Sequence, residues 1–292
     1  MIGITGANGQ LGRAVVDEVL RLRPKAELAV SVRDPHRAAD LADRGVHVRA
    51  GDYDQPDSLR AAFGGVSQLL LMPTPIPDPE ARIAQHLPVI AAAIDAGVSH
   101  IVYPGAHAAD KFDNPLLQAH DRIAATIRES GASWTILGNA IYADVIAQEV
   151  LGAEAAGELA APAGAARVAP VLRRDLASAT AAVLTTDGHA DRNYELTAPD
   201  TVDWNDLAAI AADRSGTQVR YRPVDSEEAR ARLVATGAPD AMIAIALGFY
   251  DAYRAGWCGT PSADLGYLCG LADRQPASAA DAVRAAADGA AH

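Results

Sequence analysis

The chain has 292 residues, of which 50% are hydrophobic, and its 37 acidic and 25 basic residues give a net charge of −12. This composition predicts a globular protein with a substantial core, and the acidic balance without a basic tract argues against direct binding of nucleic acid or of an anionic membrane surface. Because no run of about 18 apolar residues occurs and the first residues already read as a strand, we expect neither a membrane span nor a signal peptide, and we expect a cytoplasmic protein.

Short apolar, β-branched segments alternate with helical segments along the first 140 residues. The predicted strands are 2–5, 28–32, 46–49, 68–72, 100–103 and 134–137. Apolar residues at helical spacing predict helices at 11–22, 81–96 and 120–130. This alternation predicts an α/β fold with a doubly wound parallel sheet of the Rossmann type, in which ligands bind beyond the carboxyl ends of the strands.

The segment TGANGQLG follows the first predicted strand and carries glycines at Gly6, Gly9 and Gly12. In such a loop the first glycine permits a tight turn, the second lets the backbone approach a phosphate, and the third lets the helix pack close to the sheet. The amides of Gln10 and Leu11 then lie at a helix N-terminus, where the dipole favours an anion. The loop therefore predicts a dinucleotide site.

Residues after the next three strands are predicted to contact the same ligand. Arg33 follows strand 28–32, and a guanidinium there can stack on adenine and pair with a 2′-phosphate, so we predict NADP(H) in preference to NAD(H). Asp52 and Tyr53 fall where the adenine edge is expected, although Asp52 is equally suited to capping a turn. Met72 and Pro73 begin a proline-rich loop at the nicotinamide end of the site and are predicted to lie under the nicotinamide ring.

The family resemblance rests on the segments GITGANGQLG, SVRDP, GDYDQPDSL and SGASWTILGNAIYAD. Together they resemble the NmrA-like group of atypical short-chain dehydrogenase/reductases, and within it the bacterial NADPH:quinone reductases, triphenylmethane reductases and triad-lacking ketoreductases. The resemblance implies an NADP-binding Rossmann domain over residues 1–140, with 166–198 docking back onto it. It also implies a small α+β substrate lobe formed by 141–165 and 199–292.

The same resemblance implies roles for individual residues. The pyrophosphate would lie against Gly6, Asn8, Gly9, Gln10 and Leu11, and Arg33 would contact the 2′-phosphate. Asn139 and Tyr142 match a family N-x-x-Y pattern and would lie near the nicotinamide.

The proton donor is not evident from the sequence. Many members of the superfamily use a Ser, Tyr and Lys triad with Tyr-x-x-x-Lys on a helix, but none of the eight tyrosines here has lysine four residues on. His107, Tyr142 and Tyr103 are the candidate acids, and Tyr103 is also a predicted cofactor contact; His120, at the start of a predicted helix, is a weaker candidate. The alternatives are a surface loop for His107, core aromatics for the tyrosines and a helix cap for His120. Solvent or the substrate itself is a further possible proton source.

The second half of the chain is less sharply patterned. Residues 152–171 are rich in small residues and are predicted to be a flexible segment near the cleft, followed by a helix from Arg173. Short strands are predicted at 193–196 and 219–221. The apolar helix in 240–259 carries a stripe of Met242, Ile245, Phe249 and Tyr253; such a stripe is usually core, but its first three residues are also predicted to line a pocket for a flat aromatic substrate.

Two functions are consistent with these features. The first is an NADPH-dependent reductase that passes a hydride to a quinone or to an aromatic or polyketide-type ketone, the latter in secondary metabolism. The second is a regulatory sensor like NmrA, which binds NADP(H) without turnover. The missing triad favours the sensor, and the full C-terminal lobe favours the enzyme. We expect a small aromatic substrate, a monomer or homodimer, and no metal, because Cys258 and Cys269 match no zinc spacing.

Overall fold

The computed structural model describes residues 1–290, and a seven-stranded parallel sheet stands at its centre. The strand order is β3-β2-β1-β4-β5-β6-β9, so the winding reverses between β1 and β4. The strands are β1 (Ile2–Thr5), β2 (Leu28–Val32), β3 (His47–Ala50), β4 (Gln68–Leu70), β5 (His100–Ala106), β6 (Ser133–Asn139) and β9 (Arg192–Leu196). The predicted doubly wound Rossmann fold is confirmed.

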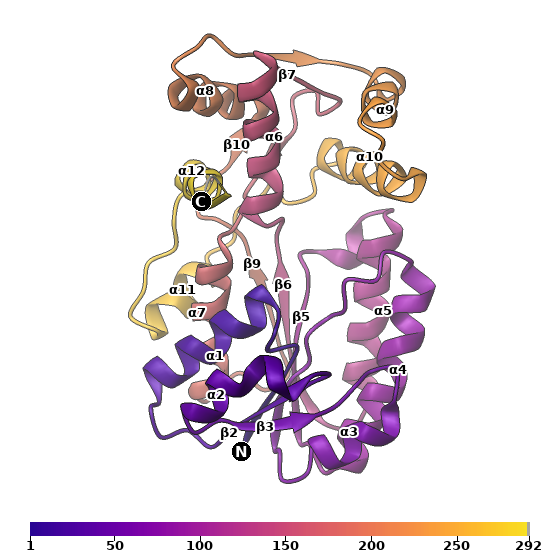
Figure 1. Cartoon of the computed structure of the whole chain (residues 1–292), viewed down its shortest axis with the longest axis vertical. Coiled ribbons are helices and arrows are strands. Elements are labelled where there is room, and N and C mark those ends of the chain that lie inside the picture. The colour runs from indigo at the N-terminus through magenta and orange to yellow at the C-terminus, as the bar shows by residue number, and fades with distance from the viewer. Residues whose placement is uncertain (291–292) are drawn as a thin grey trace.

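Helices cover both faces of this sheet (Figure 1). One face carries α1 (Gln10–Leu22), α2 (Ala39–Asp43), α7 (Arg173–Thr185) and α11 (Asp264–Leu271), and the other carries α3 (Pro56–Ala62), α4 (Pro79–Asp95) and α5 (Pro115–Glu129). The alanine-rich helix α7 is buried from Asp175 to Thr185 because its small side chains let α1 and α11 pack closely around it. Two short 3-10 helices, η1 (Pro35–Ala38) and η2 (Ala109–Lys111), follow β2 and β5.

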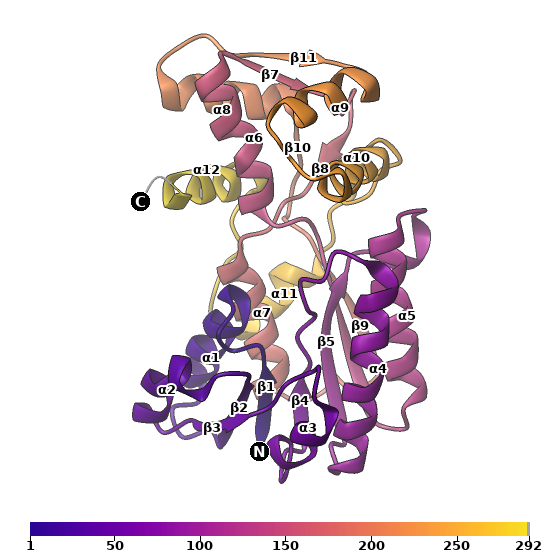
Figure 2. The same cartoon turned by 45° about the vertical axis from the view of Figure 1, so that its right-hand side comes forward.

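A smaller set of elements lies beyond the carboxyl ends of the strands (Figure 2). It contains α6 (Ala143–Ala156), β7 (Glu158–Ala161), β8 (Arg167–Val168), β10 (Val202–Asp203), α8 (Trp204–Ser215), β11 (Arg220–Pro223), α9 (Ser226–Ala235), α10 (Asp240–Arg254) and α12 (Ala279–Ala290). β7 pairs with β11 in parallel and β8 with β10 antiparallel. We call these elements the lobe. Assigning the sheet to the cofactor and the lobe to the substrate stays a prediction.

The prediction of a flexible segment at 152–171 is wrong. The segment completes α6 and forms β7 and β8, and nine of its twenty residues are buried. Gly157 and Gly164, at φ +73° and +58°, mark two tight turns. The small side chains between those turns allow β7 to pack against β11 and α6, so they serve close packing rather than mobility.

Strand β5 is longer than predicted, reaching Ala106 instead of residue 103. Pro104 and Gly105 are poor strand formers, but β4 ends at Leu70 opposite Val102. Past that point β5 pairs only with β6, so the missing N–H of Pro104 leaves no ladder bond unmade. Within residues 1–290, no helix combines the length and apolar character needed to cross a membrane.

Candidate active site

The bend between β1 and α1 is held by close backbone contacts. Gly6 has φ +64°, and its carbonyl accepts the N–H of Gly9 at 2.9 Å. A Cβ on Gly12 would lie 2.4 Å from the carbonyl oxygen of Gly6, so only glycine lets α1 begin this close to the turn. Both features are those that the sequence predicts for a phosphate-binding loop.

The N-terminus of α1 is open to an anion. No side chain caps its first turn, which also contains no acidic residue. Gln10, the first residue of α1, is exposed, so the uncapped amides at this end of the helix lie near the surface. The helix dipole and these unbonded donors favour a negative group at this point. The residues present therefore fit the pyrophosphate of a dinucleotide.

A polar link joins this loop to the loop after β2. The Asn8 amide donates to the carbonyl of Asp34 at 3.4 Å, and Arg13 donates to the Asn8 side-chain oxygen at 3.4 Å. Arg13 is held by Asp40 at 2.6 Å. Arg33, adjacent to Asp34, is exposed and makes no ion pair within residues 1–290. Its free guanidinium beside the phosphate loop fits a 2′-phosphate.

Tyr53 follows one strand, and its hydroxyl hydrogen-bonds to residues at the ends of two others, so it is not free to bind a ligand. Its hydroxyl lies 2.7 Å from Oγ1 of Thr5 and 3.0 Å from the carbonyl of Met72, and the Met72 N–H donates to Thr5 at 2.8 Å. Burial raises the pKa of Tyr53, so the phenol stays protonated. Thr5 was missed in the sequence analysis; the signal was a hydroxyl at the last position of a buried strand.

The other residues predicted to contact the cofactor lie in the loops that follow β3 and β4. Asp52 accepts the N–H of Asp54 at 3.1 Å, which is the turn-capping contact that the sequence left open. Met72 lies against the first glycine, since a Cβ on Gly6 would be 3.1 Å from the Met72 Cβ. Pro73 follows it, half-buried, in the proline-rich loop.

Tyr103 belongs to a buried chain of side chains. Its hydroxyl is 2.8 Å from Nδ1 of His120, and Nε2 of His120 is 3.0 Å from a guanidinium nitrogen of Arg82. A guanidinium only donates, so Nε2 accepts and the His120 proton lies on Nδ1. Burial, and after it the charge of Arg82, lower the pKa of His120 to about 3, so the ring is neutral.

This chain of contacts does not favour either residue as an acid. Tyr103 has no exposed surface, and burial raises its pKa, in keeping with the core-aromatic alternative. His120 does not start its helix, contrary to the prediction; α5 begins at Pro115, and Asn114 caps it by accepting from the amides of Leu116 and Leu117. We retain neither residue as a proton donor.

His107 and Glu195 form an ion pair at the carboxyl ends of β5 and β9. Nδ1 of His107 lies 2.6 Å from Oε2 of Glu195, and the imidazole side chain is 12% exposed. The same oxygen accepts the N–H of Ala108 at 3.0 Å, while Oε1 accepts from Asn193 at 2.9 Å. Burial alone would raise the pKa of Glu195, but its contacts with His107, Ala108 and Asn193 outweigh burial and lower it.

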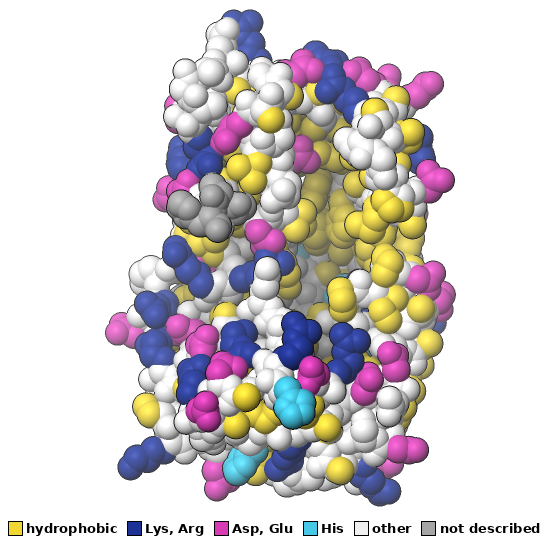
Figure 3. Space-filling model, viewed as in Figure 1, with side chains coloured by type: hydrophobic (Ala, Val, Ile, Leu, Met, Phe, Trp, Pro, Cys, Tyr) yellow, Lys and Arg dark blue, Asp and Glu magenta, His cyan; other side chains and the backbone are white. Residues whose placement is uncertain are grey.

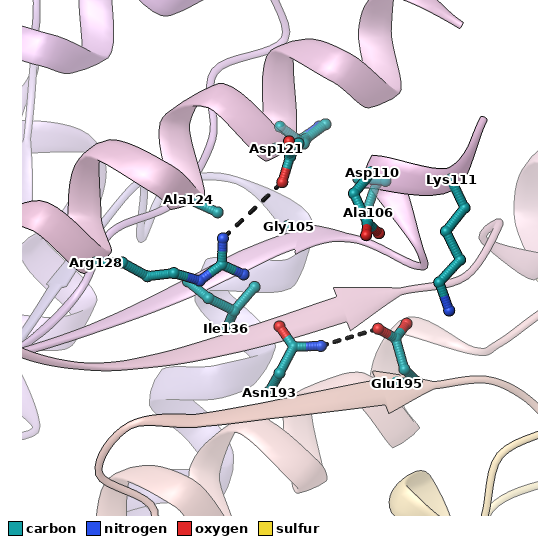
Figure 4. Close-up of a pocket in the computed structure, with 12 residues that line it drawn as sticks. Gly105, Ala106, Asp110, Lys111, Asp121, Ala124, Arg128, Ile136, Asn193 and Glu195 are labelled. Carbon is teal, nitrogen blue, oxygen red and sulfur yellow. Dashed lines mark hydrogen bonds and ion pairs between the residues drawn. The ribbon is translucent and has the colours of Figure 1, made fainter. Parts of the chain in front are cut away.

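Glu195 was also missed in the sequence analysis. The only signal was a carboxylate near the end of the last strand of the sheet. Glu195 and Asn193 line a cavity of about 420 Å³. Figure 4 shows both residues on β9, with Asp121 and Arg128 of α5 on the opposite wall. The cavity lies on the α5 side of the sheet.

Asn139 and Tyr142 stand together at the end of β6. Their side chains are 3.5 Å apart, from the amide nitrogen to the hydroxyl. Asn139 is buried, and its Oδ1 has no hydrogen-bond partner within the described residues, so it is free to accept from an N–H. The Arg173 guanidinium lies 4.5 Å over the Tyr142 ring and pairs with Asp144. Burial raises the pKa of Tyr142, which keeps its hydroxyl protonated.

The apolar stripe of α10 divides into two parts. Tyr253 is buried and stacks on Trp257, with ring centres 5.8 Å apart, so it belongs to the core of the lobe. Met242 is 50% exposed, and Ile245 and Phe249 are half-buried. Figure 3 shows a hollow between the lobe and the part of the molecule built on the sheet. Hydrophobic side chains gather beside this hollow, and Lys and Arg side chains gather on the surface below it.

The whole chain resembles known reductases. Residues 1–256 match the NmrA-like family. Quinone oxidoreductase 2 of Escherichia coli strain K12 is 34% identical over 242 residues, which cover 83% of this chain and 84% of that protein. The structure of Citrobacter sp. triphenylmethane reductase complexed with NADP(H) has a TM-score of 0.89 at 36% identity, covering 98% of this chain and 99% of that one. An NADPH-dependent quinone oxidoreductase from Escherichia coli, complexed with NADPH, has a TM-score of 0.91 at 31% identity, covering 97% and 98%. These matches confirm the resemblance seen in the sequence: the chain belongs to the NmrA-like family.

Proposed function

We propose that this chain uses NADPH to reduce a quinone or another flat aromatic acceptor, and that it does so without a Ser-Tyr-Lys triad. The relatives are named as reductases, and the two structures hold NADP(H) or NADPH. The class that they share confirms the prediction of an NAD(P)H-dependent oxidoreductase with NADP(H) as its cofactor. The acceptor is the proposed part, and a polyketide-type ketone stays a predicted alternative.

The observation that carries the proposal is the bend between β1 and α1. The approach of Gly12 to Gly6 and the uncapped amides after Gly9 make a cradle for a pyrophosphate. In the bound state Arg33 would hold the 2′-phosphate, and Met72 and Asn139 would flank the nicotinamide end. The cofactor supplies the hydride, and the protein supplies position and a proton.

We assign the proton to His107 in preference to Tyr142. The imidazole lies 2.6 Å from the carboxylate of Glu195, and a histidine ring nitrogen can carry a proton and release it. Tyr142 is protonated, but its ring is covered by the Arg173 guanidinium and its hydroxyl accepts from the amide of Asn139. Solvent stays the alternative donor for an acceptor whose reduced oxygen is itself acidic.

The acceptor would bind under α10. Met242 is exposed, and Ile245 and Phe249 are half-buried, so α10 offers an apolar, partly aromatic surface. A flat ring buries area on such a surface without needing a polar partner. This surface is why a quinone or aromatic ketone is proposed rather than a sugar or a small hydroxy acid.

The experiment has a binding arm and a turnover arm. For binding, Arg33→Ala is compared with Arg60→Ala, an exposed arginine on α3 that also lacks an ion pair within residues 1–290. Loss of the 2′-phosphate contact should weaken NADPH by about tenfold or more and leave NADH nearly unchanged, since a tenfold loss is about 1.4 kcal/mol. Equal losses for NADPH and NADH would refute the role of Arg33.

For turnover, oxidation of NADPH is followed by its absorbance with a panel of quinones, triphenylmethane dyes and polycyclic ketones. Turnover on a flat aromatic member supports the proposal. Tight NADPH binding with no turnover on any acceptor would overturn the reductase and favour the regulatory sensor. Failure to bind either reduced nucleotide would overturn both.

A further inference from the structure

The carboxylate of Glu195 reaches His107 across the intervening strand β6. In the sheet register Glu195 lies opposite Gly138, and Gly138 lies opposite Gly105 of β5. A Cβ on Gly138 would stand 2.7 Å from Oε2 of Glu195 and 3.3 Å from the Cα of His107. Glycine at this position is therefore what leaves room for the side chain of Glu195 to pass over β6.

The backbone on both sides of the imidazole is fixed by other bonds. The His107 N–H donates to the carbonyl of Asn139 at 2.9 Å, and the His107 carbonyl accepts from the indole of Trp257 at 2.7 Å. The next N–H, of Ala108, goes to Glu195. With the backbone held, the orientation of the ring depends on its own contact with Glu195 at Nδ1. That contact is a close ion pair, since neither ring nitrogen makes a hydrogen bond of ordinary geometry within the described residues.

We propose that Glu195 is a positioning residue that keeps the His107 proton on Nδ1 and leaves Nε2 as the nitrogen that serves the acceptor. This inference rests on the proposed function. A carboxylate that accepts from one ring nitrogen selects the tautomer and orientation of the ring, and it stabilises the imidazolium.

The acceptor takes a hydride from NADPH, and the imidazolium gives the proton on Nε2 to the reduced oxygen. One acceptor, one NADPH and one proton yield the reduced product and NADP⁺. Nε2 regains its proton from solvent before the next turnover, while the proton on Nδ1 stays with Glu195.

A purely structural reading of Glu195 makes a different prediction. The carboxylate also accepts the N–H of Ala108, a residue with φ +44°, and thereby supports the turn into η2. If that were its whole role, removing its charge would change stability but neither the tautomer of His107 nor the balance between kcat and KM.

Two variants test the contact from opposite sides. Glu195→Gln removes the charge while keeping the shape of the side chain. Gly138→Ala leaves Glu195 and His107 unchanged in sequence, but its added Cβ displaces the carboxylate of Glu195. Glu158→Gln, in an ion-pair cluster on β7, and Gly152→Ala, with no atom within 4 Å of the added Cβ, are the matched controls. Thermal unfolding of each variant establishes that it is folded.

The first readout is the ¹⁵N spectrum of the His107 ring, which needs no turnover. We expect the neutral ring of the wild type to carry its proton on Nδ1, and we expect both test variants to lose that preference while both controls keep it. A wild-type ring protonated on Nε2, or an unchanged pattern in Glu195→Gln, would overturn the inference even if Gly138→Ala failed to fold.

The second readout is kinetic. We expect both test variants to lower kcat by about tenfold, the usual scale for losing an orienting partner, with little change in the KM for NADPH. Unchanged kcat with an altered tautomer would overturn the step from position to proton transfer. His107→Asn separates the two proposals: unchanged turnover in that variant removes His107 as the acid, while the ¹⁵N result still decides whether Glu195 positions the ring.

Discussion

Replacing Gly12 by alanine perturbs the phosphate loop at its tightest point. The added Cβ would lie 2.4 Å from the carbonyl oxygen of Gly6, 2.9 Å from its carbonyl carbon and 3.1 Å from the Cα of Ala7. All three atoms are backbone, so no side chain can swing aside, and the start of α1 must move by most of an ångström. Overpacking of this kind costs about 1–3 kcal/mol.

A second glycine-to-alanine change supplies the reference. Gly152 lies in α6 and is exposed, and a Cβ there meets nothing within 4 Å. Gly152→Ala should therefore stabilise the protein by about 0.5–1 kcal/mol through helix propensity alone. Gly12→Ala gains the same term but also carries the overlap, so we expect the two variants to differ by about 1–3 kcal/mol in the free energy of unfolding.

The assay is urea unfolding of both variants beside a titration with NADPH. Because the displaced helix start carries the amides that face the pyrophosphate, Gly12→Ala should also weaken NADPH by about tenfold or more. Gly152→Ala should leave binding unchanged. If Gly12→Ala matched Gly152→Ala in both stability and NADPH affinity, the close approach of α1 to the turn would not be what builds the site.

Three other measurements follow from the structure. Burial lowers the pKa of His120 to about 3 in the folded state, below its ordinary value of 6.5. Folding therefore favours the neutral ring, whose stabilising effect is complete above pH 6.5 and is lost as the pH falls toward 3. Between pH 7 and 5 the free energy of unfolding in urea should fall by about 2 kcal/mol more for the wild type than for His120→Asn, and parallel losses would refute this. Tyr53→Phe removes a half-buried hydroxyl bonded at two strand ends and should lower the free energy of unfolding by about 1–2 kcal/mol, whereas an unchanged urea midpoint would show that the network does not stabilise the fold. Phe249→Ala should raise the KM for an aromatic acceptor several-fold without changing NADPH affinity, while Val234→Ala, exposed on α9, should change neither; equal effects would argue against acceptor binding under α10.

Part of the nucleotide end of the site could be predicted from the sequence. The bend after β1 has the expected form, whereas Tyr53 bonds to Thr5 and Met72, and the role of Arg33 stays a prediction. Strands β1 and β2 have the predicted bounds, and the glycines between β1 and α1 adopt the expected bend. These signals are local: a positive φ, the spacing of three glycines and an arginine at a strand end all lie within a few residues of one another. The family resemblance rests on the same segments and is confirmed.

The catalytic end could not be predicted in the same way. The sequence placed Tyr103 and His120 among the candidate acids, but it could not show that they bond to each other and to Arg82 in a buried chain. Which face of a strand a residue occupies, and what covers that face, depends on helices that arrive much later in the chain. The same limit explains the segment 152–171, whose small residues suggested flexibility until β11 and α6 were seen against it.

The sequence by itself determined the alternation of strands and helices and the bend after β1, because short-range backbone geometry specifies both. Only the tertiary structure decided that Glu195 meets His107. That pairing depends on β9 joining the sheet beside β6 and on Gly138 lacking a side chain at the crossing point. Strand order and register are set by packing across the whole fold, so no local pattern around either residue records their contact.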